Sequence, residues 1–399
     1  MYELKKLKDC ANIIAGQSPE SKYYNTNGDG IPFFQGKTDF GAVYPQVRVY
    51  CSQPTKVAEK DDILLSVRAP VGPTNLSPGT VCIGRGLTAI RPNETLDLHF
   101  LLYYFKFFEV QLSSKGTGTT FKAITQAIVK DLDIPVPPLP EQERIVARIE
   151  ELFSSLDNAV ETLKKTKEQL AVYRQAVLKE AFEAAIQGDN AKSDMLSIEE
   201  LLTTDRKGMA TGPFGTMIKK HEHQKSGIPM LGIENIGEGK YVDGNKIFVT
   251  TEKAEELKSF ALHEGDIIIS RSGTVGEICA VPQRAEGALL STNLMRVSLN
   301  HDVIRSDYFI FLFQSKGIVL DQVKELCKGS TRIFLNQTIL KQIQFPVPSL
   351  NKQMEIVYKI ESRLSVCESI EQTVDTALAQ ADALRQSILK QAFEGGFNQ

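Results

Sequence analysis

Pro135-Val136-Pro137-Pro138-Leu139-Pro140-Glu141-Gln142 begins the stretch that decides the fold, because the chain returns to it as Pro346-Val347-Pro348-Ser349-Leu350-Asn351-Lys352-Gln353. The likeness continues without a gap to Glu183 in the first copy and to Glu394 in the second, and 19 of the 49 paired positions are identical. Self-similarity at a fixed offset is the signature of an internal repeat. The sequence therefore predicts two copies of one structural unit.

The repeated stretch carries apolar residues at alternating steps of four and three, which is the heptad pattern of a coiled coil. Pro140 suits the first helical position and Glu141 the first turn, so we expect a helix of about 46 residues and roughly 70 Å. The second copy lacks both residues, which predicts a less sharp start there. The expected seam consists of Ile145, Ile149, Leu152, Leu156, Leu163 and Leu170 in the first helix and Ile356, Ile360, Ile370, Val374, Leu384 and Ile388 in the second.

A helix of this length with a narrow apolar stripe needs a partner, and the other copy is the natural one. A local two-fold relation between the copies predicts an antiparallel coiled coil with one globular domain at each end. The alternative is a single helix packed on its own domain.

The segments that precede the helices also correspond, although more loosely. Asp62-Ile63-Leu64-Leu65-Ser66 matches Asp266-Ile267-Ile268-Ile269-Ser270, and Gly118-Thr119-Thr120 matches Gly329-Ser330-Thr331. Short β-branched runs separated by Gly, Pro and Asn, with one helical run per copy, predict an α+β fold in which each globular domain has a strand-rich centre. We expect a first domain over 1–138, a helix over 139–188, a second domain over 189–349 and a second helix over 350–399.

The overall composition is that of an ordinary globular protein, with 399 residues, 42 % apolar and 24 % charged. The start shows no signal peptide and no run of about 18 apolar residues occurs, so we expect a cytoplasmic location. The net charge of −3 counts mildly against a nucleic-acid binder. A chain with this net charge can still bind nucleic acid through a local basic surface, to which partner subunits add further phosphate contacts.

This arrangement resembles the specificity subunit of type I restriction-modification systems. The resemblance rests on the Gly118-Thr119-Thr120 turn, the Ile134–Gln142 stretch and the long helix, all of which recur, and on the two Asp-Ile strands. It covers essentially the whole chain, and the doubled order of the motifs is more specific than any one of them.

The resemblance implies a recognition subunit that is not itself an enzyme. Each globular part would be a target recognition domain for one half of an asymmetric, bipartite site in double-stranded DNA. The helices would set the spacer and dock two methyltransferase subunits, and restriction or translocase subunits can join. S-adenosylmethionine and ATP would be bound by these partners, with no cofactor or metal in this chain.

Three regions of each copy offer side chains suited to base or phosphate contact. They are the segment after the Ile-Pro strand, the turn after the Asp-Ile strand and the Gly-Thr loop. Asp39, Lys240 and Ser272 flank the candidates. The candidates are Gln35, Lys37, Ser66, Arg68, Lys115, Thr117, Thr119, Thr120 and Lys122 in the first copy and Glu234, Asn235, Ser270, Arg271, Lys328, Ser330, Thr331 and Arg332 in the second.

Two other classes of protein stand as alternatives. A coiled-coil scaffold without intrinsic DNA specificity is the other interpretation of the heptads. A self-sufficient enzyme finds little support, because Gly36-Lys37-Thr38 lacks the leading glycine of a phosphate-binding loop, Ile31 standing in its place. His221-Glu222-His223 has no further metal ligand near it in the sequence, so a solvated charged loop is the better interpretation.

Overall fold

The computed structural model describes residues 3–116, 123–187, 193–215, 217–273, 275–326 and 334–394. The chain divides into two compact units, and the division does not follow chain order. Unit 1 consists of Met1–Lys164 together with Asp375–Gln399, and unit 2 consists of Lys165–Val374. The last part of the chain therefore belongs to the same unit as the first. We call the globular part of unit 1 domain 1 and that of unit 2 domain 2.

Domain 1 is built from short strands and several helices of its own, of which α2 is the longest. Its elements are β1 (Leu4–Lys6), α1 (Leu7–Cys10), β2 (Ala11–Ala15), η1 (Ser21–Tyr23), β3 (Tyr24–Asn25), β4 (Ile31–Phe34), η2 (Lys37–Asp39), β5 (Val49–Cys51), β6 (Val57–Ala58), β7 (Ile63–Ser66), β8 (Thr74–Leu76), β9 (Val81–Ile83), β10 (Leu87–Pro92), α2 (Leu98–Ser114), α3 (Gln126–Lys130) and β11 (Asp133–Pro135).

Domain 2 repeats this plan with additional short elements. They are β12 (Asp194–Ser197), α5 (Ile198–Leu201), β13 (Met209–Thr211), η3 (Lys220–Glu222), β14 (Ile228–Leu231), η4 (Ile233–Asn235), β15 (Ile236–Gly237), β16 (Lys240–Tyr241), β17 (Ile247–Val249), α6 (Thr251–Glu256), η5 (Lys258–Phe260), β18 (Ile267–Ser270), β19 (Ile278–Ala280), η6 (Gln283–Ala285), β20 (Leu289–Leu290), β21 (Leu294–Val297), α7 (Ser306–Gln314), the π-helical turn η7 (Lys316–Leu320), α8 (Asp321–Leu326), α9 (Gln337–Gln342) and β22 (Gln344–Val347).

Each domain has a central four-stranded sheet, and the two sheets have the same topology. Its strand order is β2-β10-β7-β8 in domain 1 and β13-β21-β18-β19 in domain 2, antiparallel throughout. A second sheet in each domain contains one parallel pair, β4 with β9 and β14 with β20. The central strands β7 and β18 are buried along their whole length, as their unbroken apolar runs require. The α+β prediction is confirmed.

The long helices α4 (Leu139–Gln187) and α10 (Leu350–Glu394) begin at equivalent residues. Gln142, fully buried, donates from its side-chain amide to the carbonyls of Pro137 and Thr95 and accepts from the backbone N–H of Asp97. Gln353 makes the same three bonds, to Pro348, Val303 and Arg305. The expectation of a less sharp second start is wrong, because this buried amide fixes the first turn without Pro or an acidic residue.

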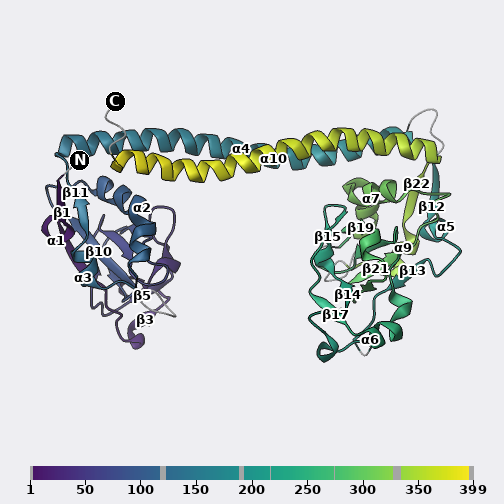
Figure 1. Ribbon diagram of the computed structural model, residues 1–399, viewed down its shortest axis with the longest axis horizontal. Coiled ribbons are helices and arrows are strands. Elements are labelled where there is room, and N and C mark those ends of the chain that lie inside the picture. Colours follow the sequence, from purple (N-terminus) through teal and green to yellow (C-terminus); the bar gives the residue numbers. More distant parts are fainter. Residues whose placement is uncertain are drawn as a thin grey trace. The chain divides into compact units, whose positions relative to one another are not determined.

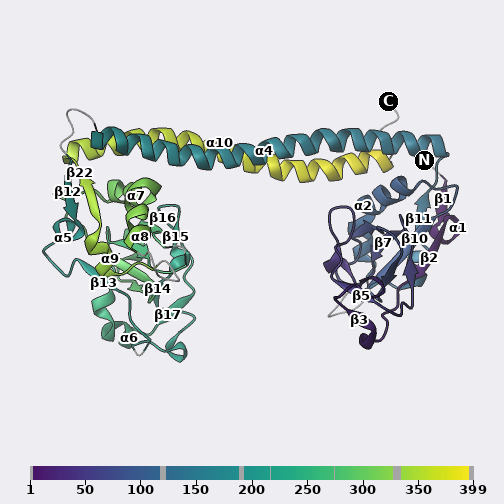
Figure 2. The same cartoon turned by 180° about the vertical axis from the view of Figure 1, so that it is seen from behind.

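Each long helix carries a phenylalanine near its far end, at equivalent positions of the repeat. Phe393, near the end of α10, packs edge-on against Tyr104 of α2 at 5.4 Å, and Phe182, near the end of α4, packs edge-on against Tyr308 of α7 at 5.5 Å. Figure 1 shows the end of α10 beside the start of α4 above α2, and Figure 2 shows α7 under the other pair of helix ends. Each domain is thus held by the start of one long helix and the end of the other.

Within each unit the two helices run antiparallel. In unit 2 Arg174 binds Glu371 and Arg363 binds Glu180, while in unit 1 Arg385 binds Asp157 and lies over the ring of Phe153. The antiparallel pairing predicted from the heptads is confirmed. None of the described helices is long and apolar enough to cross a membrane.

Ten of the twelve residues predicted for the seam are buried or half-buried, and two are exposed. Ile145, Ile149, Leu170, Ile356, Ile360, Val374 and Ile388 are buried, and Leu152, Leu156 and Leu163 are half-buried. Ile370 and Leu384 are 40 % and 49 % exposed, whereas Glu371 and Arg385, their neighbours, turn inward to make ion pairs. A helix of 3.6 residues per turn drifts against a strict heptad, which moves the inward position by one residue.

Candidate nucleic-acid interface

A concave site of about 270 Å³ lies in domain 1 where four strands end. Loops that follow β2, β4, β7 and β9 supply its walls. The lining side chains and backbone belong to Ser18, Gln35, Gly36, Lys37, Thr38, Ser66, Arg68, Ala69, Pro70, Arg85 and Gly86. The predicted residues Gln35, Lys37, Ser66 and Arg68, from two separate segments, therefore meet at one site.

Arg85, Ser18 and Thr38 are the lining residues with polar side chains that sequence reasoning missed. Arg85 stands between Gly84 and Gly86, in the tight connection from β9 to β10. A Cβ atom on Gly86 would lie 2.2 Å from the carbonyl oxygen of Gln35, so this position cannot carry a side chain without a shift of backbone. A cation between two glycines is the signal that was available, because such a turn lets the backbone approach while it presents one charged side chain.

The guanidinium groups of Arg68 and Arg85 are exposed and unpaired. Within the described residues, Arg48, Arg68 and Arg85 are the arginines whose guanidinium has neither an ion-pair nor a hydrogen-bond partner, and every other described arginine has one. The other described arginines are Arg91, Arg144, Arg148, Arg174, Arg206, Arg271, Arg284, Arg296, Arg305, Arg363 and Arg385. Two of the three unpaired groups converge on this one site.

Ser66 serves the site from below its surface. Its side chain is buried, and its hydroxyl donates within 3.1 Å of the carbonyl of Arg68 and 2.8 Å of that of Pro70. The prediction that Ser66 contacts DNA is therefore wrong, because both its burial and its bonds assign it to holding the Arg68 turn.

Domain 2 offers different chemistry at the equivalent positions. Backbone bonds from Gly84 to Phe34 and from Val67 to Gly86 recur as Ser291 to Leu231 and Arg271 to Asn293, which equates Arg85 with Thr292. In the same way Arg68 corresponds to Ser272 and Ser18 to Phe214. The short helices η2 and η4 each follow a glycine, Gly36 and Gly232, so Ile233 is equivalent to Lys37 and the half-buried Glu234 to Thr38. No cation of domain 1's site is retained at these positions.

Three other predicted residues of domain 2 lie inside it. Ser270 and Asn235 are fully buried, and the Asn235 side chain bonds the backbone of Gly232 and Val242. Arg271 is 8 % exposed, donates to the carbonyls of Leu335 and Thr292, and lies 4.7 Å from the ring of Phe334. Burial lowers the pKa of the Arg271 guanidinium. This burial leaves little of the three side chains open to direct contact with DNA, contrary to the expectation from the sequence.

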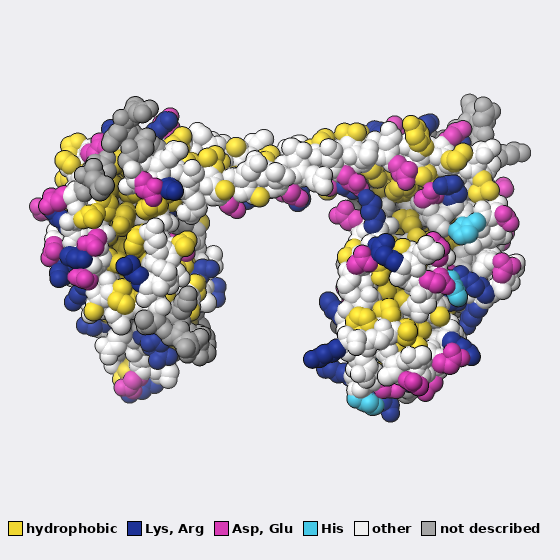
Figure 3. All heavy atoms as spheres, in the orientation of Figure 1, with side chains coloured by type: hydrophobic (Ala, Val, Ile, Leu, Met, Phe, Trp, Pro, Cys, Tyr) yellow, Lys and Arg dark blue, Asp and Glu magenta, His cyan; other side chains and the backbone are white. Residues whose placement is uncertain are grey.

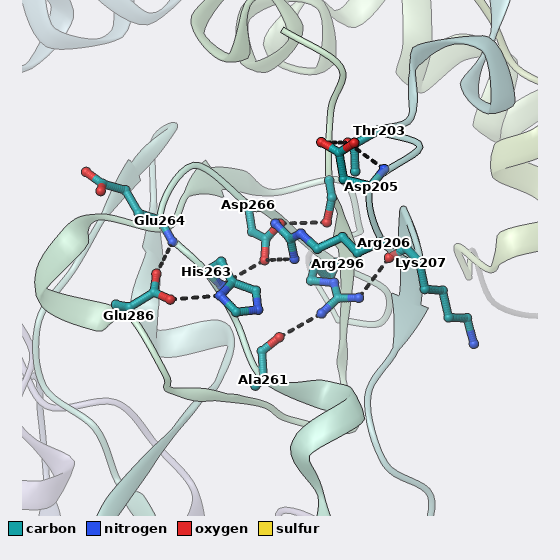
Figure 4. A network of polar contacts seen from close by, with 11 residues as sticks. Thr203, Asp205, Arg206, Lys207, Ala261, His263, Glu264, Asp266, Glu286 and Arg296 are labelled. Atoms are coloured by element: carbon teal, nitrogen blue, oxygen red, sulfur yellow. Dashed lines mark hydrogen bonds and ion pairs between the residues drawn. The ribbon is translucent and has the colours of Figure 1, made fainter.

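The aspartate of each Asp-Ile strand anchors its domain. Asp62 accepts two bonds from Arg91 and the backbone N–H of Glu59, and this bonding raises the pKa of Arg91. Asp266 accepts two bonds from Arg206, the hydroxyl of Ser298 and the N–H of His263, as Figure 4 shows for most of these groups. The arginine comes from β10 in domain 1 and from the loop before β13 in domain 2, so the repeat keeps the acid but not its partner.

The Gly-Thr loops lie mainly outside the described residues. The predicted contacts Thr117, Thr119, Thr120 and Lys122 in domain 1 and Lys328, Ser330, Thr331 and Arg332 in domain 2 fall there. Lys115 is described and exposed. After the gap in domain 1, Ala123 forms a bridge with Arg68, and the N–H of Ile124 bonds the carbonyl of Val67. In domain 2 the N–H of Leu335 bonds the carbonyl of Arg271, the residue equivalent to Val67. The chain thus re-enters each domain beside the turn that follows the Asp-Ile strand.

The visible face of the molecule carries both signs of charge. Figure 3 shows Lys and Arg side chains interspersed with Asp and Glu over both domains. No group of three or more His, Cys, Asp or Glu residues suited to a metal ion occurs in the described ranges. Glu222, from the His-Glu-His stretch, instead pairs with Lys253 at 2.9 Å.

Comparison with known proteins decides the family. The model of the type I restriction modification DNA specificity domain matches residues 1–171 and 212–379. The chain belongs to the type I restriction-modification DNA specificity family. Proteins of this family recognise DNA sequence, and catalysis resides in partner subunits of the restriction-modification complex.

The relatives agree with this assignment. A putative type I restriction enzyme MjaX specificity subunit of Methanocaldococcus jannaschii is 42 % identical over 167 residues, which is 42 % of this chain and 38 % of that protein. The EcoBI specificity subunit of Escherichia coli is 23 % identical, with 98 % of this chain and 85 % of that protein covered. The match to the first relative thus spans well under half of its length.

One solved structure shares the whole fold. It was determined in work on complex assembly and conformational transition of the type I R-M system. The TM-score is 0.74 at 18 % identity, and 98 % of this chain and 97 % of that chain are covered. At this identity the likeness concerns the fold.

Proposed function

We propose that each domain of this chain reads one half of an asymmetric, bipartite site in double-stranded DNA. The observation that carries this proposal is the concave site of domain 1, which is lined by four exposed residues: Gln35, Lys37 and the two arginines with unpaired guanidinium groups, Arg68 and Arg85. Arg, Lys and Gln are the side chains that contact phosphates and base edges in DNA complexes. Different side chains at the equivalent positions of domain 2 favour two half-sites that differ in sequence.

The partners are two methyltransferase subunits, and restriction or translocase subunits where the host has them. We assign S-adenosylmethionine and ATP to these partners, and the assembly to the cytoplasm. The net charge of −3 supports this division, because a chain without an overall positive charge gains phosphate contacts from its partners.

The long helices set the number of unread base pairs between the half-sites. Support comes from the two helical repeats, which match over 49 positions without an insertion. The test inserts the same number of residues into α4 and α10 at equivalent positions. The spacer of the methylated sequence should change while both half-sites stay the same. A spacer of unchanged length would contradict the proposal that the helices act as a ruler.

Methylation mapping tests the function itself. This chain and the methyltransferase encoded with it are expressed in a host without other DNA methylation, and modified bases are mapped over the genome. We expect a split asymmetric sequence with a fixed gap, lost when this chain is deleted. Methylation that persists without the chain, or that has no fixed sequence, would instead favour a coiled-coil scaffold.

A further inference from the structure

The concave site of domain 1 is built on a rigid base. The N–H of Gly84 bonds the carbonyl of Phe34 at 2.8 Å, the N–H of Leu87 bonds Gly84 at 3.0 Å, and the N–H of Val67 bonds Gly86 at 3.0 Å. The N–H of Arg85 itself lies 3.3 Å from the hydroxyl of Ser18. The backbone on both sides of Arg85 is thereby fixed before any ligand arrives.

The turn that carries Arg68 is fixed as well. The buried hydroxyl of Ser66 bonds the carbonyl of Arg68, and Arg68 forms a bridge with Ala123. A side chain that leaves a fixed backbone loses less freedom on binding, which increases the affinity of each contact it makes. Fixed positions also suit a base edge, whose acceptors occupy one place, better than a mobile phosphate.

The neighbouring residues indicate what the two arginines contact. Gln35 is exposed beside them and carries a neutral amide, which suits a base edge rather than a phosphate charge. Lys37 is exposed at the rim, and its point charge suits a phosphate. The planar fork of a guanidinium matches the O6 and N7 acceptors of guanine in the major groove, which is the commonest specific contact in such complexes.

We propose that Arg68 and Arg85 read guanine in the half-site bound by domain 1, through the major-groove acceptors O6 and N7. This inference rests on the proposed function. It assigns a base to one of the two half-sites and makes these two residues determinants of specificity, while Lys37 contacts the backbone.

The test uses the complex of the full chain with its methyltransferase and duplexes of the mapped target. Each guanine in turn is replaced by 7-deazaguanine, which lacks the N7 acceptor, and by inosine, which keeps N7 and O6. For at least one guanine of one half-site, 7-deazaguanine should weaken binding about tenfold, and inosine should have little effect.

Variants then connect that guanine to a residue. In the complex with Arg68→Ala or Arg85→Ala, binding should be weaker, and 7-deazaguanine at the corresponding position should cause no further loss. Arg68→Lys keeps the charge but not the fork, so it should resemble Arg68→Ala. Arg48→Ala is the matched control, because Arg48 is also exposed and unpaired in domain 1 but does not line the site.

The results of these binding experiments distinguish the guanine assignment from the proposed function. Equal sensitivity to 7-deazaguanine in the wild-type and both alanine variants would overturn the guanine assignment. A half-site without guanine would overturn it too. These results leave sequence-specific binding intact, whereas a wild-type complex without any sequence preference would contradict the proposed function itself.

Discussion

Domain 1 and domain 2 use one scaffold for two different surfaces. The same backbone hydrogen bonds hold the loops at the ends of the central strands, yet these loops present Arg68, Arg85 and Lys37 in domain 1. The equivalent positions in domain 2 carry Ser272, Thr292 and Ile233. A scaffold with its own buried anchors leaves the exposed loop positions free to vary, because changes there cost little stability.

The surface of domain 2 also exposes an aromatic residue where domain 1 has a serine. Phe214 is 59 % exposed, and its neighbour Pro213 accepts a hydrogen bond from Thr292. Apolar contact with the methyl group of thymine is the base readout open to such a side chain. The comparison teaches that reading chemistry cannot be carried from one domain to the other by the repeat alone.

Exchange of residues 1–134 for the corresponding part of another family member should have the largest effect. We expect one half of the methylated sequence to change completely and the other half to remain, because each domain has its own core and its own loops. Methylation mapping gives the result directly. If both halves changed, the two domains would not read independently.

Truncation of the helix-end phenylalanines should cost the next largest amount. Phe182→Ala removes a fully buried ring from domain 2, at a cost of about 3–5 kcal/mol, and Phe393→Ala should cost less in domain 1, because Phe393 is half-buried. Hydrogen exchange of the central strands reports each domain separately. Val172→Ala, at an exposed position of α4, is the control and should leave both domains protected.

Phe182→Ala and Phe393→Ala also test which helix end packs on which domain. Phe182 precedes domain 2 in the chain, and Phe393 follows it, although Phe393 packs on domain 1. Loss of protection in domain 2 on Phe393→Ala, with domain 1 unchanged, would contradict this packing.

Loss of the buried aspartates should have an intermediate effect. Asp62→Asn and Asp266→Asn each remove the charge that two guanidinium bonds and one backbone N–H share, at a cost of about 2 kcal/mol. This cost is below that of a fully buried pair, because Arg91 and Arg206 are about one-third exposed. Asp266→Asn should cost more, since it also disturbs the bond from Ser298. Exchange rates of β7 and β18 would give both values, with the exposed Glu255→Gln as control.

Arg68 and Ser272 occupy equivalent positions and should differ in their effect on DNA binding. Arg68→Ala should weaken binding to the target about tenfold, and Ser272→Ala should change it by less than about threefold, because a hydroxyl that bonds Asn293 at 3.4 Å makes a weak contribution. Binding titrations of the two complexes at one salt concentration compare them. Equal losses would show that position, rather than chemistry, decides the contribution.

Lys240→Ala should have the smallest effect. Lys240 joins the hairpin of β15 and β16 to Glu368 of α10 at 2.7 Å, but its side chain is largely exposed. Exposed ion pairs contribute about 0–1 kcal/mol, so protection in domain 2 should hardly change. A large loss would mean that this hairpin, for which domain 1 shows no described counterpart, holds domain 2 to its helices.

Much of the fold could be predicted from the sequence, and the reasons are local. The gap-free repeat of Gln142 and Gln353, the heptad spacing and the unbroken apolar runs of β7 and β18 are properties of neighbouring residues, and they determined two copies, paired helices and strand-rich domains. The family followed from the order of these motifs. Part of the candidate site followed too, because Gln35, Lys37 and Arg68 stand directly after strands.

Only the tertiary structure decided the rest. Arg85 lies at the site because loops from four strands meet there. The buried residues below such loops are Ser66, Ser270, Asn235 and Arg271. Phe182 and Phe393 occupy equivalent positions of the repeat, yet Phe182 packs on domain 2 and Phe393 on domain 1, which the repeat alone does not indicate. Glu371 and Arg385 lie inward, each one residue after the position that the heptad predicted, and both form ion pairs with the other helix. These positions depend on contacts between residues that are distant in the sequence, and a local sequence pattern does not predict such contacts.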